Sequence, residues 1–215
     1  MHARAGELPP ERTRPTIPNW PTGPAAQPDQ PTPPRLPLVV EPLATSLDEA
    51  LLQRRVVAVT GNLDAQLATD TAARLLHLDA TAEGSITVRL DCGTAEVGAA
   101  LVLVDTFGSL RAQLHLVVVG QAAGAAVVVV AAAHSSSIYP HARIVLTEPD
   151  VPAIEGDAAH VDALLSEQRR LLAAACDVIA QRCGKPRDEI ERDMLQRRLL
   201  TAADAVDYGI VDRIE

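Results

Sequence analysis

The segment from Leu116 to Ala133 is 18 residues long, and Gln121 is its only polar residue. This length meets the minimum for a helix that spans a membrane. Seven of the eighteen residues are alanine, however, the centre reads Gly-Gln-Ala-Ala-Gly, and no Trp, Tyr, Lys or Arg lies at the immediate ends. We therefore expect no membrane span, but a buried strand over 114–120 and a buried helix after it. The prediction of this helix rests on its sequence context, because its four consecutive valines are poor helix formers.

Short apolar runs alternate with helical patterns along the rest of the chain. β-branched or alternating runs that end at turn residues predict strands at 55–61, 85–91, 135–140 and 142–148. Apolar residues at helical spacing predict helices at 63–80, 96–110, about 157–183 and 186–195. Thr201 and Asp204 have capping-box spacing ahead of a last helix and strand. This alternation predicts an α/β fold in which helices cover a parallel sheet.

Proline divides the chain into two parts. Eleven of the sixteen prolines lie in residues 1–37, which contain few aliphatic side chains. Such a segment cannot bury enough surface to offset its ordering entropy, so we expect residues 1–37 to be a disordered or polyproline-like tail. Residues 38–215 are rich in Ala, Val and Leu and are numerous enough for a full hydrophobic core. We therefore expect one domain with an N-terminal tail.

Charge and cysteine content narrow the function classes. The chain has 19 basic and 28 acidic residues, a formal net charge of −9, so it lacks the basic patch that neutralises nucleic-acid phosphates. The N-terminus lacks the charged start and apolar run of a secretory signal. The cysteines show neither metal-ligand spacing nor a paired framework, which favours buried thiols in a reducing cytoplasm; they are Cys92, Cys176 and Cys183. We expect a cytoplasmic protein with no nucleic-acid partner, no metal and no cofactor.

The order of the elements carries more information than any single motif. The chain has no P-loop, no G-x-G-x-x-G after the first strand, no H-E-x-x-H and no G-x-S-x-G. From about Leu51 to its C-terminus it nevertheless resembles ClpP, the proteolytic subunit of the Clp protease. The resemblance rests on five phrases in the right order: GKPRDEIERD with LTAADAVDYGIVDRI, LDCGTAEVGAALVLVDTF, VVVGQAAGAA and HARIVLTEP. It implies a ClpP/crotonase-like spiral of ββα units, with the helix at 157–183 as the handle that joins two heptameric rings.

The resemblance also identifies the positions of the catalytic triad. The serine of the family corresponds to Gly124, the histidine to Thr147 and the aspartate to Arg197. Glycine has no side chain to attack a carbonyl, threonine cannot act as a general base near neutral pH, and a cation would repel an imidazolium. Triad chemistry needs a nucleophile, a base and an orienting anion. All three are replaced here.

The oxyanion loop departs from the family as well. The Pro-Gly-Gly of ClpP, which supplies a backbone donor, corresponds to Gly93, Thr94 and Ala95 in a short glycine-containing turn, and Ala125 follows the nucleophile position. Glycine's freedom to adopt positive φ is lost at two of these places. We therefore expect the preorganised oxyanion donor to be lost with the triad.

A serine run offers another place for a nucleophile. Ser135, Ser136 and Ser137 follow His134, and His141 is close by. Serine beside histidine is typical of nucleophilic catalysis. Adjacent residues on a strand point to opposite faces, however, and a Ser-rich connection is ordinarily a polar loop, so we interpret this stretch as a loop entering a strand. In the same way, the carboxylates of RDEIERD indicate a solvated helix face.

The resemblance and the replaced residues together favour a catalytically degenerate ClpP-like subunit, comparable to the inactive ClpR-type paralogues, with a structural or regulatory role. Its expected partners are other ClpP-like subunits, in homo- or hetero-heptameric rings, and a Clp ATPase through the assembly. The aromatics of the family's ATPase-docking groove are replaced by Thr87 and Arg89. Two alternatives stay open: an active Clp serine endopeptidase subunit with a relocated nucleophile, and a crotonase-like acyl-CoA binder, which rests on the shared spiral fold alone.

Overall fold

The computed structural model describes residues 43–149 and 157–215, all of them within the compact unit Val40–Glu215. The predicted proline-rich tail, residues 1–37, lies outside the described residues. In chain order the elements are α1 (Leu43–Gln53), β1 (Val56–Leu63), α2 (Ala65–Thr81), β2 (Ile86–Ala95), α3 (Val97–Ser109), β3 (Leu114–Ala123), α4 (Ala126–Ala132), β4 (Ser135–Ile138), β5 (Arg143–Leu146), α5 (Ala158–Cys183), α6 (Arg187–Leu195), β6 (Arg198–Leu200), α7 (Ala202–Tyr208) and β7 (Arg213–Ile214).

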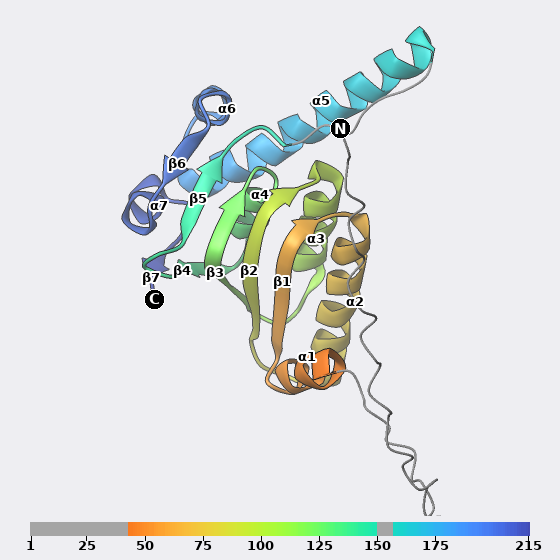
Figure 1. Ribbon diagram of the computed structural model, residues 1–215, viewed down its shortest axis with the longest axis vertical. Coiled ribbons are helices and arrows are strands. Elements are labelled where there is room, and N and C mark those ends of the chain that lie inside the picture. Colours follow the sequence, from red (N-terminus) through yellow and green to blue (C-terminus); the bar gives the residue numbers. More distant parts are fainter. Residues whose placement is uncertain (1–42, 150–156) are drawn as a thin grey trace, which may run out of the picture. The chain divides into compact units, whose positions relative to one another are not determined.

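The strands form one seven-stranded sheet, which confirms the predicted α/β fold (Figure 1). The order β1-β2-β3-β4-β7 is parallel throughout, and β6 alone is antiparallel, to β5. Strand β3 has two successive neighbours on one side: β4 pairs with its first half and β5 with its second half. This arrangement carries β5 to the same end of the sheet as the last residues of β3.

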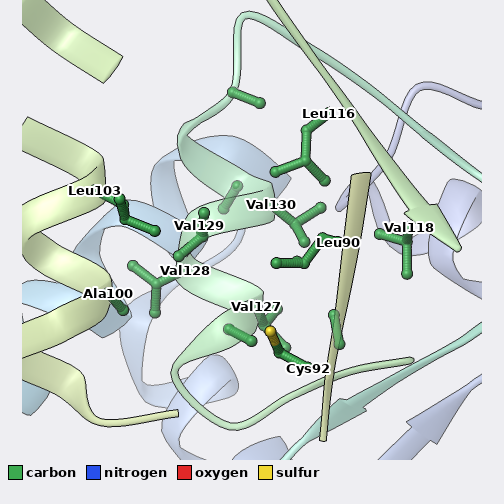
Figure 2. Packing of buried hydrophobic residues seen from close by; sticks show 14 of the residues in the cluster. Leu90, Cys92, Ala100, Leu103, Leu116, Val118, Val127, Val128, Val129 and Val130 are labelled. Atoms are coloured by element: carbon green, nitrogen blue, oxygen red, sulfur yellow. The ribbon is translucent and has the colours of Figure 1, made fainter. Parts of the chain in front are cut away.

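The apolar run at 116–133 forms a strand and then a helix, as predicted. Val127, Val128, Val129 and Val130 of α4 are all fully buried, and Figure 2 shows them between α3 and the strands β2 and β3. Burial of one such side chain contributes about 1.5–3 kcal/mol, which outweighs the low helix propensity of valine. None of the described helices is both long and apolar enough to cross a membrane.

The long helix predicted at 157–183 is α5, 26 residues long, which starts at the N-cap Asp157 and ends at Gly184 in the left-handed conformation. Between His160 and Ala174 none of its residues is buried by the rest of the described chain. Its second half packs against the core through Ala175, Cys176 and Ile179. The capping box of Thr201 and Asp204 is present at the start of α7.

Three expectations were wrong. The glycine turn expected at 92–95 is the end of β2, because β1 continues to pair with it up to Ala95. The strand predicted at 135–140 is β4, but the serine run forms its buried start and not a polar loop ahead of it, with Ser136 and Ser137 fully buried. Asp193, expected on a solvated helix face, is 7% exposed because it accepts a hydrogen bond from the Tyr208 hydroxyl at 2.8 Å and pairs with Arg198 at 2.9 Å. Helix α1 and strand β6 were not predicted.

Candidate functional site

The ends of three strands bring the predicted triad positions together. Ala123 of β3 pairs with Val145 of β5 in parallel, so that the residues beyond both strand ends lie side by side. The backbone N–H of Gly124 donates to the Val145 carbonyl at 3.2 Å, and Thr147 follows one residue after the end of β5. The strand pairing alone therefore places Gly124 beside Thr147.

Arg197 reaches the same place from the other side of β5. Leu146 pairs with Arg198 in the antiparallel β5–β6 ladder, so Arg197, the residue before β6, lies next to the end of β5. Its φ is +51°, in the left-handed region that residues with a Cβ rarely adopt. The backbone N–H of Arg197 donates to the Met194 carbonyl at 3.1 Å, which ties this turn to the end of α6.

These strand ends enclose a pocket of about 230 Å³. Its lining residues are Gly93, Thr94, Ala95, Ala123, Gly124, Thr147, Glu148, Pro149 and Arg197. Six of the seven positions singled out in the sequence thus face one pocket. The seventh, Ala125, is fully buried and forms the N-cap of α4.

Gly124 leaves room at the predicted nucleophile position. A Cβ built at Gly124 would lie 3.7 Å from the Pro149 Cα and 3.8 Å from the Thr147 side chain, which are ordinary contact distances. The φ of Gly124 is +56°. The pocket therefore has space for a side chain at this position, and the residue present offers none.

The other two positions carry no base and no orienting anion. The Thr147 hydroxyl is half-buried, and its nearest hydrogen-bond acceptor is the Glu148 carbonyl at a marginal 3.5 Å. The Arg197 side chain is exposed. A guanidinium stays protonated at any pH compatible with folding, so it cannot take a proton from a nucleophile.

The expected oxyanion loop is the end of strand β2, which resumes its pairing with β1 after a register shift between Thr60 and Asn62. Thr94 pairs with Asn62 of β1 and Ala95 with Leu63, and the Thr94 hydroxyl donates to the Asn62 side chain at 2.9 Å. Neither Thr94 nor Ala95 has positive φ. The backbone here is therefore held in the β1–β2 ladder and is not shaped into a separate donor loop.

The serine run contacts a histidine that the sequence reasoning did not consider. His115 of β3 lies between two hydroxyls of β4, with Nδ1 2.8 Å from Ser135 Oγ and Nε2 3.0 Å from Ser137 Oγ. The Ser137 hydroxyl donates to Glu215 Oε1 at 2.6 Å, and this hydrogen bond lowers the pKa of the Glu215 carboxyl. His134 instead contacts the Leu114 backbone N–H through Nδ1 at 3.4 Å. Only the β3–β4 register could have identified His115, and the sequence does not specify that register.

The described residues do not gather three His, Cys, Asp or Glu side chains in a geometry that could hold a metal ion. Burial raises the pKa of all three thiols to about 11, in each case as the largest cause. Protonated thiols of this kind are poor nucleophiles near neutral pH. None of the three cysteines lines the pocket, so they supply it with no nucleophile.

Comparison with known proteins gives the family. A model of the Clp protease family matches residues 41–215. The chain is also 28% identical, over 169 residues, to the ATP-dependent Clp protease proteolytic subunit 1 of Thermobifida fusca (strain YX), with 76% of this chain and 75% of that protein aligned. The match covers the sheet, the long helix α5 and the strand ends around the pocket. This chain belongs to the Clp protease family.

Proposed function

We propose that this chain is a catalytically degenerate subunit of a Clp protease core, with a structural or regulatory role. One observation carries the proposal: Gly124, Thr147 and Arg197, the positions that the resemblance assigns to the triad, line a single pocket and offer no nucleophile, no base and no orienting anion. A triad with every member removed retains only the catalysis that the oxyanion hole and substrate binding supply. Here the oxyanion strand supports the same conclusion, because Thr94 and Ala95 are held in the β1–β2 ladder.

Ser135 is the described serine that a relocated nucleophile would most resemble, since it contacts His115 at 2.8 Å. The second ring nitrogen of His115, however, is shared among three neighbours: Ser137 Oγ at 3.0 Å, the Arg213 guanidinium at 3.3 Å and Glu215 Oε1 at 3.5 Å. The fully buried Ser137 completes a chain of polar contacts from β3 through β4 to Glu215 after β7. We interpret this cluster as a cross-strand network that holds three neighbouring strands together.

Reaction with a fluorophosphonate tests the proposal directly. The purified chain is incubated with the reagent and its intact mass is measured, beside an active Clp proteolytic subunit as the positive control. We expect complete labelling of the control and no adduct on this chain, because activated serines alone react rapidly. A stoichiometric adduct that disappears in Ser135→Ala would replace the proposal with an active enzyme whose nucleophile lies on β4.

The assembly role predicts that this chain joins rings with other Clp proteolytic subunits. The first half of α5 supports this part of the proposal, because none of its residues from His160 to Ala174 is buried within the described chain and Leu165 is 37% exposed. Leu171 and Leu172 of the same helix pack against the core, and Leu165 lies beyond them. We infer that a partner subunit covers this part of α5.

Co-expression with an active subunit from the same organism, followed by native mass spectrometry, tests the assembly. We expect mixed rings, and we expect Leu165→Glu to weaken them while Ser166→Glu, the neighbouring exposed position on α5, leaves them intact. A chain that elutes alone, without the active subunit and without copies of itself, would contradict an assembly role. The degenerate site would then need another explanation.

Docking of a Clp ATPase is not expected to involve this subunit's own groove. Arg89 donates to the Tyr139 hydroxyl at 3.2 Å and its guanidinium lies 5.5 Å from the centre of the Tyr139 ring. The Arg89 side chain is therefore already engaged by Tyr139, and the strand face at Thr87 and Arg89 is polar. In a mixed assembly we therefore expect the ATPase to bind through the other subunits.

A further inference from the structure

Replacing the triad changes the charge of the pocket. An aspartate in a working triad contributes a negative charge, whereas Arg197 contributes a positive one. Within residues 43–149 and 157–215, no carboxylate lies within ion-pair distance of the Arg197 guanidinium, although most other arginines of this part of the chain have such partners. The pocket thus has a cation without a described counter-ion.

Arg197 is held in a costly backbone conformation. Its φ of +51° would suit glycine or asparagine better. The next residue, Arg198, fixes the turn, because its guanidinium pairs with the buried Asp193 at 2.9 Å and Asp193 also accepts from the Tyr208 hydroxyl at 2.8 Å. Strained residues that their surroundings hold in place cluster at binding sites. The strain therefore agrees with a binding role for Arg197 and does not by itself define the ligand.

The shape and the donors of the pocket define the ligand. Gly124 leaves the space of a side chain empty, and the Thr147 methyl group borders that space. The Thr147 hydroxyl has only a marginal acceptor at 3.5 Å, so it is available to donate to a ligand in the pocket that Thr147 lines. A guanidinium presents two parallel N–H groups that match the two oxygens of a carboxylate. A small planar anion that enters beside Gly124 would find both kinds of donor.

We propose that this pocket binds the terminal carboxylate of a peptide, with Arg197 as the ion-pair partner and Thr147 as a hydrogen-bond donor. The inference rests on the proposed function, because a peptide held intact by its C-terminus requires that the site does not hydrolyse it. The chain then acts as a receptor for peptide ends inside a protease core. Glu148, which also lines the pocket, opposes this binding through its negative charge, so Glu148→Gln strengthens it.

A pair of peptides that differ only at the terminus tests the proposal on the full chain in its assembled state. The probes are N-acetyl-trialanine with a free carboxylate and the same peptide with a terminal carboxamide, titrated by calorimetry at low salt. An exposed or half-exposed ion pair of this kind gives a preference for the acid of about three- to tenfold. The preference shrinks as salt is added, because surface ion pairs are screened.

Two arginine variants separate the pocket from general charge. In Arg197→Gln the acid and the amide bind equally, whereas Arg192→Gln, which removes the same charge from an exposed position on α6, retains the full preference. Equal binding of the two peptides by the unmodified chain, or a preference that survives Arg197→Gln, would overturn the proposal. Acetate that binds as tightly as the acid peptide would overturn the assignment to peptides and leave a site for small carboxylates.

The same titrations distinguish failure of this inference from failure of the proposed function. Mass spectrometry of the peptides after each titration reports whether any amide bond was cleaved. Intact peptides with no acid preference overturn only the carboxylate site. Cleaved peptides would overturn the degenerate-subunit proposal, and with it the basis of the inference.

Discussion

Substituting Gly124 by alanine asks whether the missing nucleophile reflects lost chemistry or a packing requirement. The φ of Gly124 is +56°, but an added Cβ would lie no closer than 3.7 Å to its neighbours. The change therefore introduces backbone strain without a clash. Gly93, in the same pocket, is the matched control, because it does not have positive φ and its added Cβ would lie 3.7 Å from the Gln121 side chain.

The left-handed conformation costs a residue with a Cβ about 1–2 kcal/mol. A Gly-to-Ala change also lowers the entropy of the unfolded chain, which offsets about 0.4–1 kcal/mol of that cost. We therefore expect Gly124→Ala to lower the free energy of unfolding by about 1 kcal/mol. Gly93→Ala carries no such strain, and we expect it to leave stability unchanged or to raise it by up to about 1 kcal/mol.

Urea unfolding followed by far-UV circular dichroism measures both variants. The unmodified chain and the variants must be compared at one protomer concentration, because assembly contributes to apparent stability. A loss of more than about 3 kcal/mol in Gly124→Ala is the size of an overpacked or cavity-disrupted core. That result would mean that the pocket cannot hold a side chain, and that glycine is present for packing. The degenerate-site argument would then lose its geometric support.

Three further predictions follow from contacts elsewhere in the fold. Gly120→Ala should destabilise the chain, because its Cβ would lie 2.6 Å from Asp91 Oδ1; in a double-mutant cycle Asp91→Ala should relieve most of that loss, and additive effects would contradict the clash. Asp212 loses solvation on folding, but hydrogen bonds from the Ser136 N–H and Arg182 outweigh this and lower its pKa. Its contribution to stability is therefore present above its unfolded pKa and is lost as pH falls through the folded pKa, so Asp212→Asn should lose less stability than the parent chain in acid titrations monitored by circular dichroism. Burial raises the pKa of the Cys92, Cys176 and Cys183 thiols to about 11. Iodoacetamide at about pH 8 should therefore leave all three unmodified in the native chain, as judged by intact mass, and should modify all three in urea.

Local sequence patterns predicted the elements that packing also favours. The run at 114–133 has enough apolar residues to form β3 and α4 in the middle of the core, so pattern and burial agree there. Glycine misled the prediction at 92–95, because Gly93 was interpreted as a turn residue while β1 extends the pairing to Ala95. Strand β6 is three residues long and exists because β5 provides a pairing edge. No local pattern contains that information.

The candidate site was predictable only in part, and for a physical reason. Resemblance to the family predicted Gly124, Thr147 and Arg197 as triad positions one by one, but it could not say that Arg197 has positive φ or that Thr94 is held in a strand ladder. These facts depend on register between strands, which nonlocal contacts set. His115 illustrates the same limit, because its contact with Ser135 joins residues 20 positions apart through the β3–β4 register.

The backbone and the chemistry of this site depend on different residues. Pairing of β3, β5 and β6 positions Gly124, Thr147 and Arg197, and those ladders use main-chain groups that any side chain would leave in place. The stability of the region comes from buried residues that do not enter the pocket, such as Ile144, Leu146 and Leu200. The three predicted triad positions contribute little to side-chain burial, because Gly124 has no side chain, Thr147 is half-buried and Arg197 is exposed. The backbone can therefore hold this pocket together while its lining side chains set its chemistry, and here that lining includes the cation Arg197 and the anion Glu148.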